Sequence, residues 1–419
     1  MAIDNKDKKV LKSSIEREQN EVACSAECEK IKGSKNLNVP PLRFPEFSGE
    51  WKCTTIGNIG DIKNGPFGSV LHAEDYVENG IPIVTTEHFK TGLMPSDKFG
   101  IPQVSNEDYI RLKGYRLETN DIVFSRVGSV DINAHVGIEQ NGWLFSGRVL
   151  RVRPKYDIDS LFLHYALSTE AVKRDIRNRA VGQTMPSINT PILSSTTIQL
   201  PKDLFEQKKV AHFLRLLDER IITQNKIIED LKKLKSAISL NVLHSDKWEQ
   251  FKIKDIAQIG RGRVISSIEI GQQKSPTYPV YSSQTSNDGI MGYLDDYMFE
   301  GEYISWTTDG ANAGTVFYRN GKFNCTNVCG LLKLRKEFDT HFVSLVLAEA
   351  TKKYVSINLA NPKLMNNTMG NIQIRLPKLE EQKRISIVFR VLQRLWTVHN
   401  SLLTEYTKQE QYLLSQMFI

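Results

Sequence analysis

The 419-residue chain has few cysteines and no long apolar run, and both absences limit what it can be. Its five cysteines are an odd number spread thinly along the chain, which does not indicate a disulfide framework. No apolar stretch approaches the roughly 18 to 20 residues that a membrane helix needs. The lysines near the start are not followed by the apolar run of a secretory signal. We therefore expect a cytoplasmic protein with reduced thiols and no membrane partner.

Motifs for nucleotide binding and for methyl transfer are also absent. The chain has no G-x4-G-K-[ST] loop and no G-x-G-x-x-G between a strand and a helix. Asn189-Thr190-Pro191-Ile192 and Asn361-Pro362-Lys363-Leu364 do not match the Asn-Pro-Pro-aromatic motif of adenine methyltransferases. We expect no catalytic residues and no cofactor bound by this chain.

Two cysteine pairs, Cys24 with Cys28 and Cys325 with Cys329, have a spacing close to that of zinc ligands. Neither has a second His or Cys pair at a zinc-finger distance. We interpret Cys325 and Cys329 as core thiols on one face of a strand, since positions four apart share a face. No metal site is expected.

The net charge of +7 is small and spread along the chain, so it supports nucleic-acid binding only weakly. An internal repeat is more informative. Leu200-Pro201-Lys202 is followed by Glu206-Gln207-Lys208, and Leu376-Pro377-Lys378 by Glu381-Gln382-Lys383. A short strand precedes each signature, and each copy opens with a tryptophan, Trp51 or Trp248. The repeating unit is a domain followed by a helix.

After each signature, apolar residues recur at steps of three and four over several heptads, which predicts long coiled-coil helices. Gln224 and His399 occupy equivalent seam positions, where a polar residue can fix the register of the pair. The residues assigned to helix pairing are Val210, Leu214, Leu217, Ile221, Gln224, Ile228 and Leu231, and then Ile385, Val388, Leu392, Leu395, His399, Leu402 and Tyr406.

The predicted fold class is α+β, with two mixed α/β domains in tandem, separated and followed by long helices that form an antiparallel coiled coil. Strands are predicted within 121–126 and 302–306, and short helices over 160–177 and 340–353. The predicted divisions are a disordered extension over 1–36, a first domain over 37–203, a first spacer helix over 204–247, a second domain over 248–377 and a second spacer helix over 378–419.

From Asn36 to its last residue, about nine tenths of its length, the chain resembles the specificity subunits of type I restriction-modification systems. The resemblance lies in the opening Leu42-Arg43-Phe44-Pro45-Glu46-Phe47, in 121–128 and 279–283, and in the two helix entries. It implies that two target-recognition domains each read half of a bipartite site in double-stranded DNA. It also implies partners: modification methyltransferase subunits, two of them, which methylate adenine, and restriction or translocase subunits. S-adenosylmethionine, ATP and magnesium are expected on those partners.

Base edges are read by side chains such as Arg, Asn, Gln, Ser and Thr, so loops rich in them are the candidates. In the first domain the candidates are Lys63, Asn64, Thr85, Thr86, His88, Ser125, Arg126, Gln183 and Thr184. In the second they are Arg261, Arg263, Ser282, Ser283, Gln284, Thr307, Thr308, Asn312, Asn361 and Lys363. Any one of these is as readily an ordinary turn residue. Arg148, Arg151 and Arg153 suggest a strand with a basic face, for phosphate contact or for solvent.

Two other functions share part of this pattern. A tandem scaffold that binds a partner other than DNA would have the same repeat and helices. A methyltransferase or nuclease fused to its own reader would need the catalytic motifs that are missing.

Overall fold

The computed structural model describes residues 38–419 except 67–70, 156, 244 and 357–360. The extension over 1–36 and the pair Cys24 and Cys28 lie outside the described residues. The chain forms two compact units. Unit 1 runs to Ile222 and includes Thr404–Ile419, and unit 2 is Thr223–Leu403. Each unit therefore contains part of both long helices, whereas the sequence-based divisions treat the helices as separate segments.

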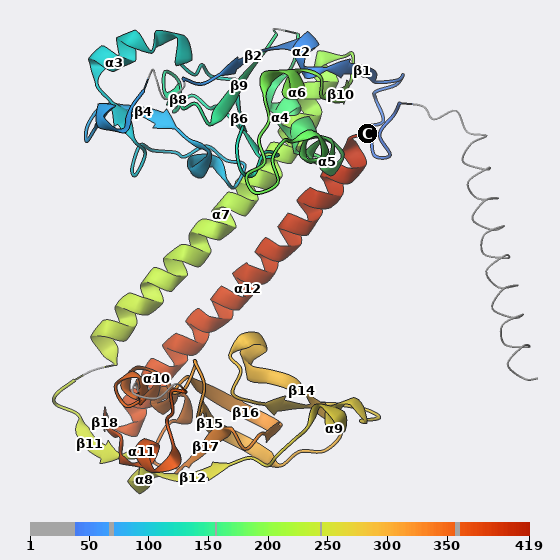
Figure 1. Cartoon of the computed structure of the whole chain (residues 1–419). Coiled ribbons are helices and arrows are strands. Elements are labelled where there is room, and N and C mark those ends of the chain that lie inside the picture. The colour runs from blue at the N-terminus through green and yellow to red at the C-terminus, as the bar shows by residue number, and fades with distance from the viewer. Residues whose placement is uncertain (1–37, 67–70, 156, 244, 357–360) are drawn as a thin grey trace, which may run out of the picture. The chain divides into compact units, whose positions relative to one another are not determined.

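Unit 1 contains two four-stranded sheets, ordered β2-β9-β6-β7 and β3-β5-β4-β8, and a two-stranded ribbon of β1 and β10 (Figure 1). Its elements are β1 (Lys52–Thr55), α2 (Ile56–Ile59), β2 (Gly60–Asn64), η1 (Ala73–Asp75), β3 (Tyr76–Val77), β4 (Ile81–Val84), η2 (Thr86–Phe89), β5 (Gln103–Val104), α3 (Asn106–Arg111), η3 (Lys113–Tyr115), β6 (Ile122–Ser125), β7 (Asn133–His135), β8 (Leu144–Phe145), β9 (Val149–Pro154), α4 (Ser160–Ser168), α5 (Glu170–Arg179), α6 (Thr190–Ser194), β10 (Thr197–Leu200) and the start of α7 (Leu204–Val242).

Unit 2 contains a six-stranded sheet, ordered β12-β17-β15-β16-β13-β14, and a two-stranded ribbon of β11 and β18. Its elements are β11 (Glu249–Lys252), α8 (Ile253–Ile256), β12 (Ala257–Arg261), α9 (Ser267–Gly271), β13 (Tyr278–Tyr281), η4 (Ser286–Gly289), β14 (Ile290–Leu294), β15 (Phe299–Thr307), β16 (Val316–Cys325), β17 (Cys329–Leu334), α10 (Thr340–Ala350), η5 (Thr351–Lys353), α11 (Asn366–Asn371), β18 (Gln373–Leu376) and the start of α12 (Leu379–Met417).

The two units are built on one frame. In each, an antiparallel ribbon leads through a short helix into a sheet whose first four strands have the same order, β2-β9-β6-β7 or β12-β17-β15-β16. The last sheet strand is followed by a helix, α4 or α10, and the ribbon's second strand enters α7 or α12. The predicted α+β fold with a tandem repeat is confirmed. Within the described ranges, no helix is long and apolar enough to cross a bilayer.

The core of each unit forms where the frame meets the long helices. Trp51 packs edge-to-face on Phe162 of α4 at 5.7 Å between ring centroids, and Trp248 packs in the same way on Phe342 of α10 at 5.9 Å. The ends of the long helices complete these cores. Leu413, Met417 and Phe418 are buried in the core of unit 1, and Leu243 is buried in that of unit 2. In Figure 1 the end of α12 lies beside α5.

The repeated glutamine of the helix entry is a buried clamp. Gln207 Nε2 donates to the carbonyl of Pro201 at 3.1 Å, and its Oε1 accepts from the backbone amide of Asp159 at 2.9 Å. Gln382 makes the same two bonds, to Pro377 at 2.8 Å and from Asp339 at 3.0 Å. Because Asp159 and Asp339 cap α4 and α10, the glutamine joins the long helix to the helix that follows the last sheet strand. This explains why the repeat contains the motif twice.

The long helices run antiparallel within each unit. In unit 2, Gln224 Oε1 accepts a hydrogen bond from His399 Nδ1 at 2.7 Å, and Gln393 Oε1 accepts one from Lys235 Nζ at 3.2 Å. Residue numbers therefore increase along α7 in the direction in which they decrease along α12. In unit 1 Arg220 lies over the ring of Tyr406. The polar seam pair expected from the sequence is therefore a direct contact.

Three seam assignments in the second helix are wrong. Val388, Leu395 and Leu402 are 45%, 42% and 37% exposed. The seam passes instead through their neighbours Phe389, Trp396 and Leu403, which are buried or half-buried. The step after Ile385 is four residues rather than three. Superposing the helices at Gln207 and Gln382 would have shown this, because Phe389 then falls on Leu214.

Two further expectations differ from the structure. The first long helix ends at Val242 rather than at 247, and Leu243 then turns into the core of unit 2. Cys325 and Cys329 do not share a strand, because Cys325 ends β16 and Cys329 begins β17 across a tight turn. Both are buried free thiols, as core residues would be.

Candidate nucleic-acid interface

The candidate residues of unit 2 gather at one end of its sheet, where β12, β13 and β15 end and β17 begins. We call loops 261–264, 282–289, 307–315, 326–328 and 361–366 loop edge 2. Backbone hydrogen bonds hold these loops together: Thr326 donates to Tyr281 at 2.9 Å, Thr308 to Val328 at 3.2 Å and Leu364 to Thr308 at 2.9 Å. Asn312 Nδ2 also donates to Thr285 Oγ1 at 3.2 Å.

The equivalent strands of unit 1 end in the same way. We call loops 64–66, 85–90, 125–130, 146–148 and 181–189 loop edge 1. Arg126 donates its backbone amide to Arg148 at 3.0 Å and accepts one from Ile188 at 2.9 Å, while Ser146 donates to Val84 at 2.9 Å. Residues that the sequence scatters over more than 100 positions are thus brought to one edge.

A glycine marks the same place in both edges. Gly65 follows β2, and a Cβ there would lie 2.0 Å from the carbonyl oxygen of Ser146. Gly262 follows β12, and a Cβ there would lie 1.6 Å from the carbonyl oxygen of Cys325. Only glycine allows such a close approach of two backbones. In both units, therefore, a glycine directly after the first sheet strand lets the backbone pack closely on a neighbouring segment.

Three candidates are buried, and the prediction that they contact bases is wrong for them. Ser125, Thr307 and Thr308 are at most 2% exposed. Thr308 donates its hydroxyl to the Val328 carbonyl at 2.8 Å, and Thr307 donates to Asn312. Their hydroxyl groups hold the ends of β6 and β15, because a buried hydroxyl needs a partner inside the protein.

Several candidates have partners within the protein but remain at the surface. Lys63 Nζ donates to the Gly114 carbonyl at 2.8 Å, Arg261 Nε donates to Asn366 Oδ1 at 2.9 Å, and Arg263 pairs with Glu269. Arg126 Nη1 donates to the Gly147 carbonyl at 2.9 Å. These cations are partly neutralised or oriented before any ligand arrives.

The 85–88 turn is a closed cap. The backbone amide of Thr85 donates to His88 Nδ1 at 3.0 Å. Thr86, which follows Thr85 in this turn, is half-buried. Burial lowers the pKa of His88, which favours the neutral ring that accepts this bond. His88 is thus an internal acceptor that shapes the turn.

The remaining candidates at the edges are polar and uncharged, except for one lysine. Half-buried or exposed positions are held by Asn64, Gln183, Thr184, Ser282, Ser283, Gln284, Asn312, Asn361 and Lys363. Gln183 and Thr184 lie at the tip of a loop closed by the bridge between Val181 and Ser187. The carbonyl oxygen of the Asn64 side chain is buried without a hydrogen-bond partner among the described residues.

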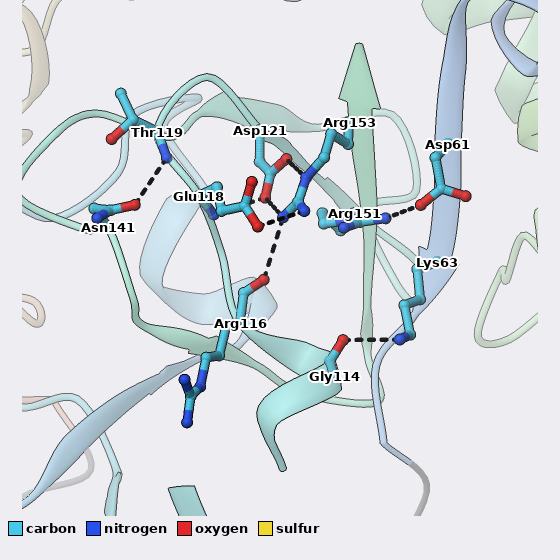
Figure 2. A network of polar contacts seen from close by, with 10 residues as sticks. All are labelled: Asp61, Lys63, Gly114, Arg116, Glu118, Thr119, Asp121, Asn141, Arg151 and Arg153. Carbon is cyan, nitrogen blue, oxygen red and sulfur yellow. Dashed lines mark hydrogen bonds and ion pairs between the residues drawn. The ribbon is translucent and has the colours of Figure 1, made fainter. Parts of the chain in front are cut away.

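The basic strand of unit 1 is not a free basic face. Figure 2 shows Arg153 directed at Asp121 and Glu118, and Arg151 at Asp61. Arg153 binds Asp121 through two nitrogens, at 2.7 and 2.8 Å. Arg151 is 4% exposed. The interpretation of a phosphate-binding strand is therefore wrong for Arg151 and Arg153. Arg148, exposed at loop edge 1, remains as a cation near Glu87.

A cavity of about 220 Å³ lies elsewhere in unit 1, beside the long helices. Tyr165, Asp218 and Glu410 meet there, and the Tyr165 hydroxyl donates to Asp218. Burial, with the nearby Asp218, raises the pKa of Glu410 to about 7. Among the described residues, no three His, Cys, Asp or Glu side chains lie in a group that could hold a metal ion.

The chain belongs to the family of type I restriction modification DNA specificity domains, whose family model matches residues 48–233 and again 245–406. The predicted resemblance is therefore confirmed. The chain is 40% identical over 150 residues to a putative type I specificity subunit of Mycoplasma pneumoniae, covering 35% of this chain and 49% of that protein. A putative type I specificity subunit N-terminus from the same organism is 45% identical over 139 residues, covering 33% of this chain and 74% of that protein. The first match thus spans about half of the relative's length.

Among solved structures, the type I restriction-modification S subunit of M. genitalium superposes with a TM-score of 0.67 at 17% identity. The match covers 91% of this chain and 99% of that one. At this identity the likeness is one of fold.

Proposed function

We propose that this chain is the subunit that reads DNA for a type I restriction-modification complex, with each unit reading one half of a split site. The observation that carries the proposal is the pair of loop edges. They stand at equivalent ends of one repeated frame, yet they present different side chains. The two units share a strand order but present different side chains at their loop edges, as two domains that read different half-sites would.

The chemistry of the edges supports DNA as the ligand. Asn and Gln side chains can pair with adenine, Arg with guanine, and Ser or Thr with either. Accessible residues of these types at loop edge 2 include Arg261, Gln284 and Asn312, and those at loop edge 1 include Gln183 and Thr184. Arg148 and Lys363 are cations suited to the flanking phosphates.

The long helices are suited to fixing the gap between half-sites. Each has 39 residues, which corresponds to about 60 Å of helix. Half-sites on one face of DNA lie about 34 Å apart for each helical turn. The polar contact between Gln224 and His399 would specify one register, because sliding the helices would bury unpaired polar groups.

An exposed apolar stripe on α12 supports docking of a modification methyltransferase subunit. Val388, Leu395 and Leu402, which were wrongly assigned to the seam, form an exposed apolar row on α12 with three other residues. We call this row the outer stripe: Ile387, Val388, Val391, Leu395, Val398 and Leu402. A continuous apolar surface on a helix usually marks a protein contact. When the helices are superposed, exposed Phe213 and Leu216 of α7 fall on Val388 and Val391. This repetition favours two docking sites and hence two methyltransferase subunits.

In this proposal the chain itself is not catalytic. S-adenosylmethionine would bind to the modification subunits, and ATP and magnesium to the restriction or translocase subunits. The chain would place the target adenines within reach of those active sites.

The test is to express the chain with a candidate modification subunit in a host that lacks adenine methylation, and to map methylated adenines across the genome. We expect one split motif with a fixed gap, methylated only when both chains are present. A stable purified complex that methylates no such motif would overturn the proposal and favour the scaffold that binds a partner other than DNA.

The docking step has its own test. The double variant Val391→Glu, Leu395→Glu places two charges in the outer stripe and should abolish co-purification of the modification subunit. Thr397→Glu is the matched control, because Thr397 is exposed on another side of α12. Equal co-purification by both variants would remove the stripe from the interface.

A further inference from the structure

The turn after β13 is held in an unusual backbone conformation. Asn287 and Asp288 have φ values of 48° and 52°, and Gly289 follows at 80°. Left-handed residues other than glycine are uncommon, and Asn and Asp adopt this conformation more readily than other residues. This turn, Ser286–Gly289, is part of loop edge 2.

A buried arginine holds the turn. Arg319 on β16 is 2% exposed, and its guanidinium carbon lies over the rings of Tyr281 and Phe317, at 3.7 and 4.4 Å from their centroids. Its Nη1 donates to Asp288 Oδ2 at 2.7 Å, and its Nη2 donates to the Asp288 carbonyl at 2.8 Å. Its Nε donates to the buried hydroxyl of Ser305 at 3.0 Å.

This anchor exceeds what a surface turn requires. Asn, Asp and Gly adopt tight turns without help, and burying a guanidinium is unfavourable unless it is fully paired. The equivalent turn of unit 1, after β4, has no left-handed residue and is closed by the local contact of Thr85 with His88. The arrangement in unit 2 is therefore not a property of the shared frame.

The anchor leaves the side chains of Ser286 and Asn287 exposed, and of the two only Asn287 carries a carboxamide. The Asp288 carboxylate is ion-paired with Arg319. This pairing neutralises a negative charge that would otherwise repel the phosphates of DNA. Asn287 is exposed, and its carboxamide makes no hydrogen bond within the part of the chain that the structure describes. An Asn carboxamide has an NH2 group that donates and an oxygen that accepts, which matches the acceptor N7 and the donor N6 amino group of adenine.

We propose that Asn287 is a base-reading residue of unit 2, with adenine as the base that its carboxamide fits, and that Arg319 is the positioning residue that fixes its turn. This inference rests on the proposed function. The proposed function assigns the second half-site to loop edge 2 as a whole, and this inference names one residue of that edge and the base that it reads.

The test uses the complete complex and the same methylation map. An exchange of residues 37–203 for those of another specificity subunit identifies which half-site belongs to unit 1. Asn287→Ala should then relax discrimination at one base pair of the other half-site by about 5- to 150-fold, the range for loss of one bidentate contact. The gap and the first half-site should not change. The melting temperature should fall slightly, because alanine is less favourable than asparagine at the left-handed φ of 48°.

Arg319→Met and Asp288→Asn should relax the same base pair, although neither side chain would touch it. A purely structural role of Arg319 would lower stability and weaken the whole motif instead. Asp288→Asn keeps a residue that tolerates the left-handed turn, so it tests positioning even if Arg319→Met fails to fold. Asn320→Ala, an exposed Asn beyond Arg319 on β16, is the matched control and should leave the motif intact.

A wild-type motif that Asn287→Ala leaves unchanged overturns this inference and leaves the proposed function standing. A change in the unit 1 half-site also overturns it. If the wild-type complex produces no split motif, the proposed function fails, and this inference fails with it.

Discussion

Replacing Gln382 by Met removes both hydrogen bonds of the buried clamp while keeping nearly the same side-chain volume. The backbone amide of Asp339 and the carbonyl of Pro377 then lose their partners in unit 2. Leaving a buried polar group unpaired costs about 1 to 3 kcal/mol. Two such groups, partly offset by the apolar gain of Met, should lower the free energy of unfolding by about 3 kcal/mol.

The assay is urea unfolding followed by circular dichroism, together with hydrogen exchange of the Asp339 amide, which should lose protection. Gln393→Met is the matched control, because Gln393 is exposed on the same helix and its side-chain oxygen accepts from exposed Lys235. Its effect should stay within about 0.5 kcal/mol.

Unit 1 provides an internal replicate, since Gln207→Met removes the same two contacts there. If Gln382→Met unfolds within about 0.5 kcal/mol of the wild type, the clamp does not stabilise the frame, and the explanation given for the repeated motif is wrong.

Three further predictions concern the helices. Phe418 packs on Trp51 and Phe162, so Phe418→Ala should destabilise unit 1 by about 3 to 5 kcal/mol in urea unfolding, whereas Ile419→Ala, at an exposed position, should not. The pKa of Glu410 is raised from 4.5 to about 7, so the folded state holds a proton that the unfolded state releases, and stability should fall as pH rises between these values. Glu410→Gln should therefore raise the melting temperature at pH 8 and change it little near pH 4.5, and an equal shift at both would contradict the assignment. Inserting one heptad in both α7 and α12 beside the Gln224–His399 contact adds about 10 Å and should widen the gap between methylated half-sites by about three base pairs. An unchanged gap would remove the spacer role.

The long helices and the repeat could be predicted because their signals are local. Seam residues from Val210 to Leu231 recur at heptad steps, and proline at the start of each signature marks the helix entry. The second seam was misassigned because α12 has two apolar faces, and Ile385 can be followed by Val388 or by Phe389 when steps of three and four are both allowed. Only packing on the partner helix separates the two faces.

The candidate interface was predicted in outline and not in detail. Residue type alone identified loops that the structure brings to two edges, because turns with Asn, Gln, Ser and Thr lie where strands end. It could not tell that Thr307 and Thr308 are buried, since their hydroxyl partners come from positions 312 and 328. Nor could it find Asn287, although the run Ser286-Asn287-Asp288-Gly289 is a turn signal, because its anchor Arg319 is 31 residues from Asp288.

The sequence by itself determined the architecture of this protein. The twofold repeat, the two long helices, the Gln224 and His399 positions and the family follow from residue order, because heptads, caps and turns are encoded over a few neighbouring residues. The tertiary structure decided which charges and polar groups remain at the surface. Arg151, Arg153 and Arg319 all read as cations in the sequence, yet Asp61, Asp121 and Asp288 pair with them from distant positions. The availability of a side chain for DNA depends on such partners, and pairing across a sheet is set by packing rather than by local order.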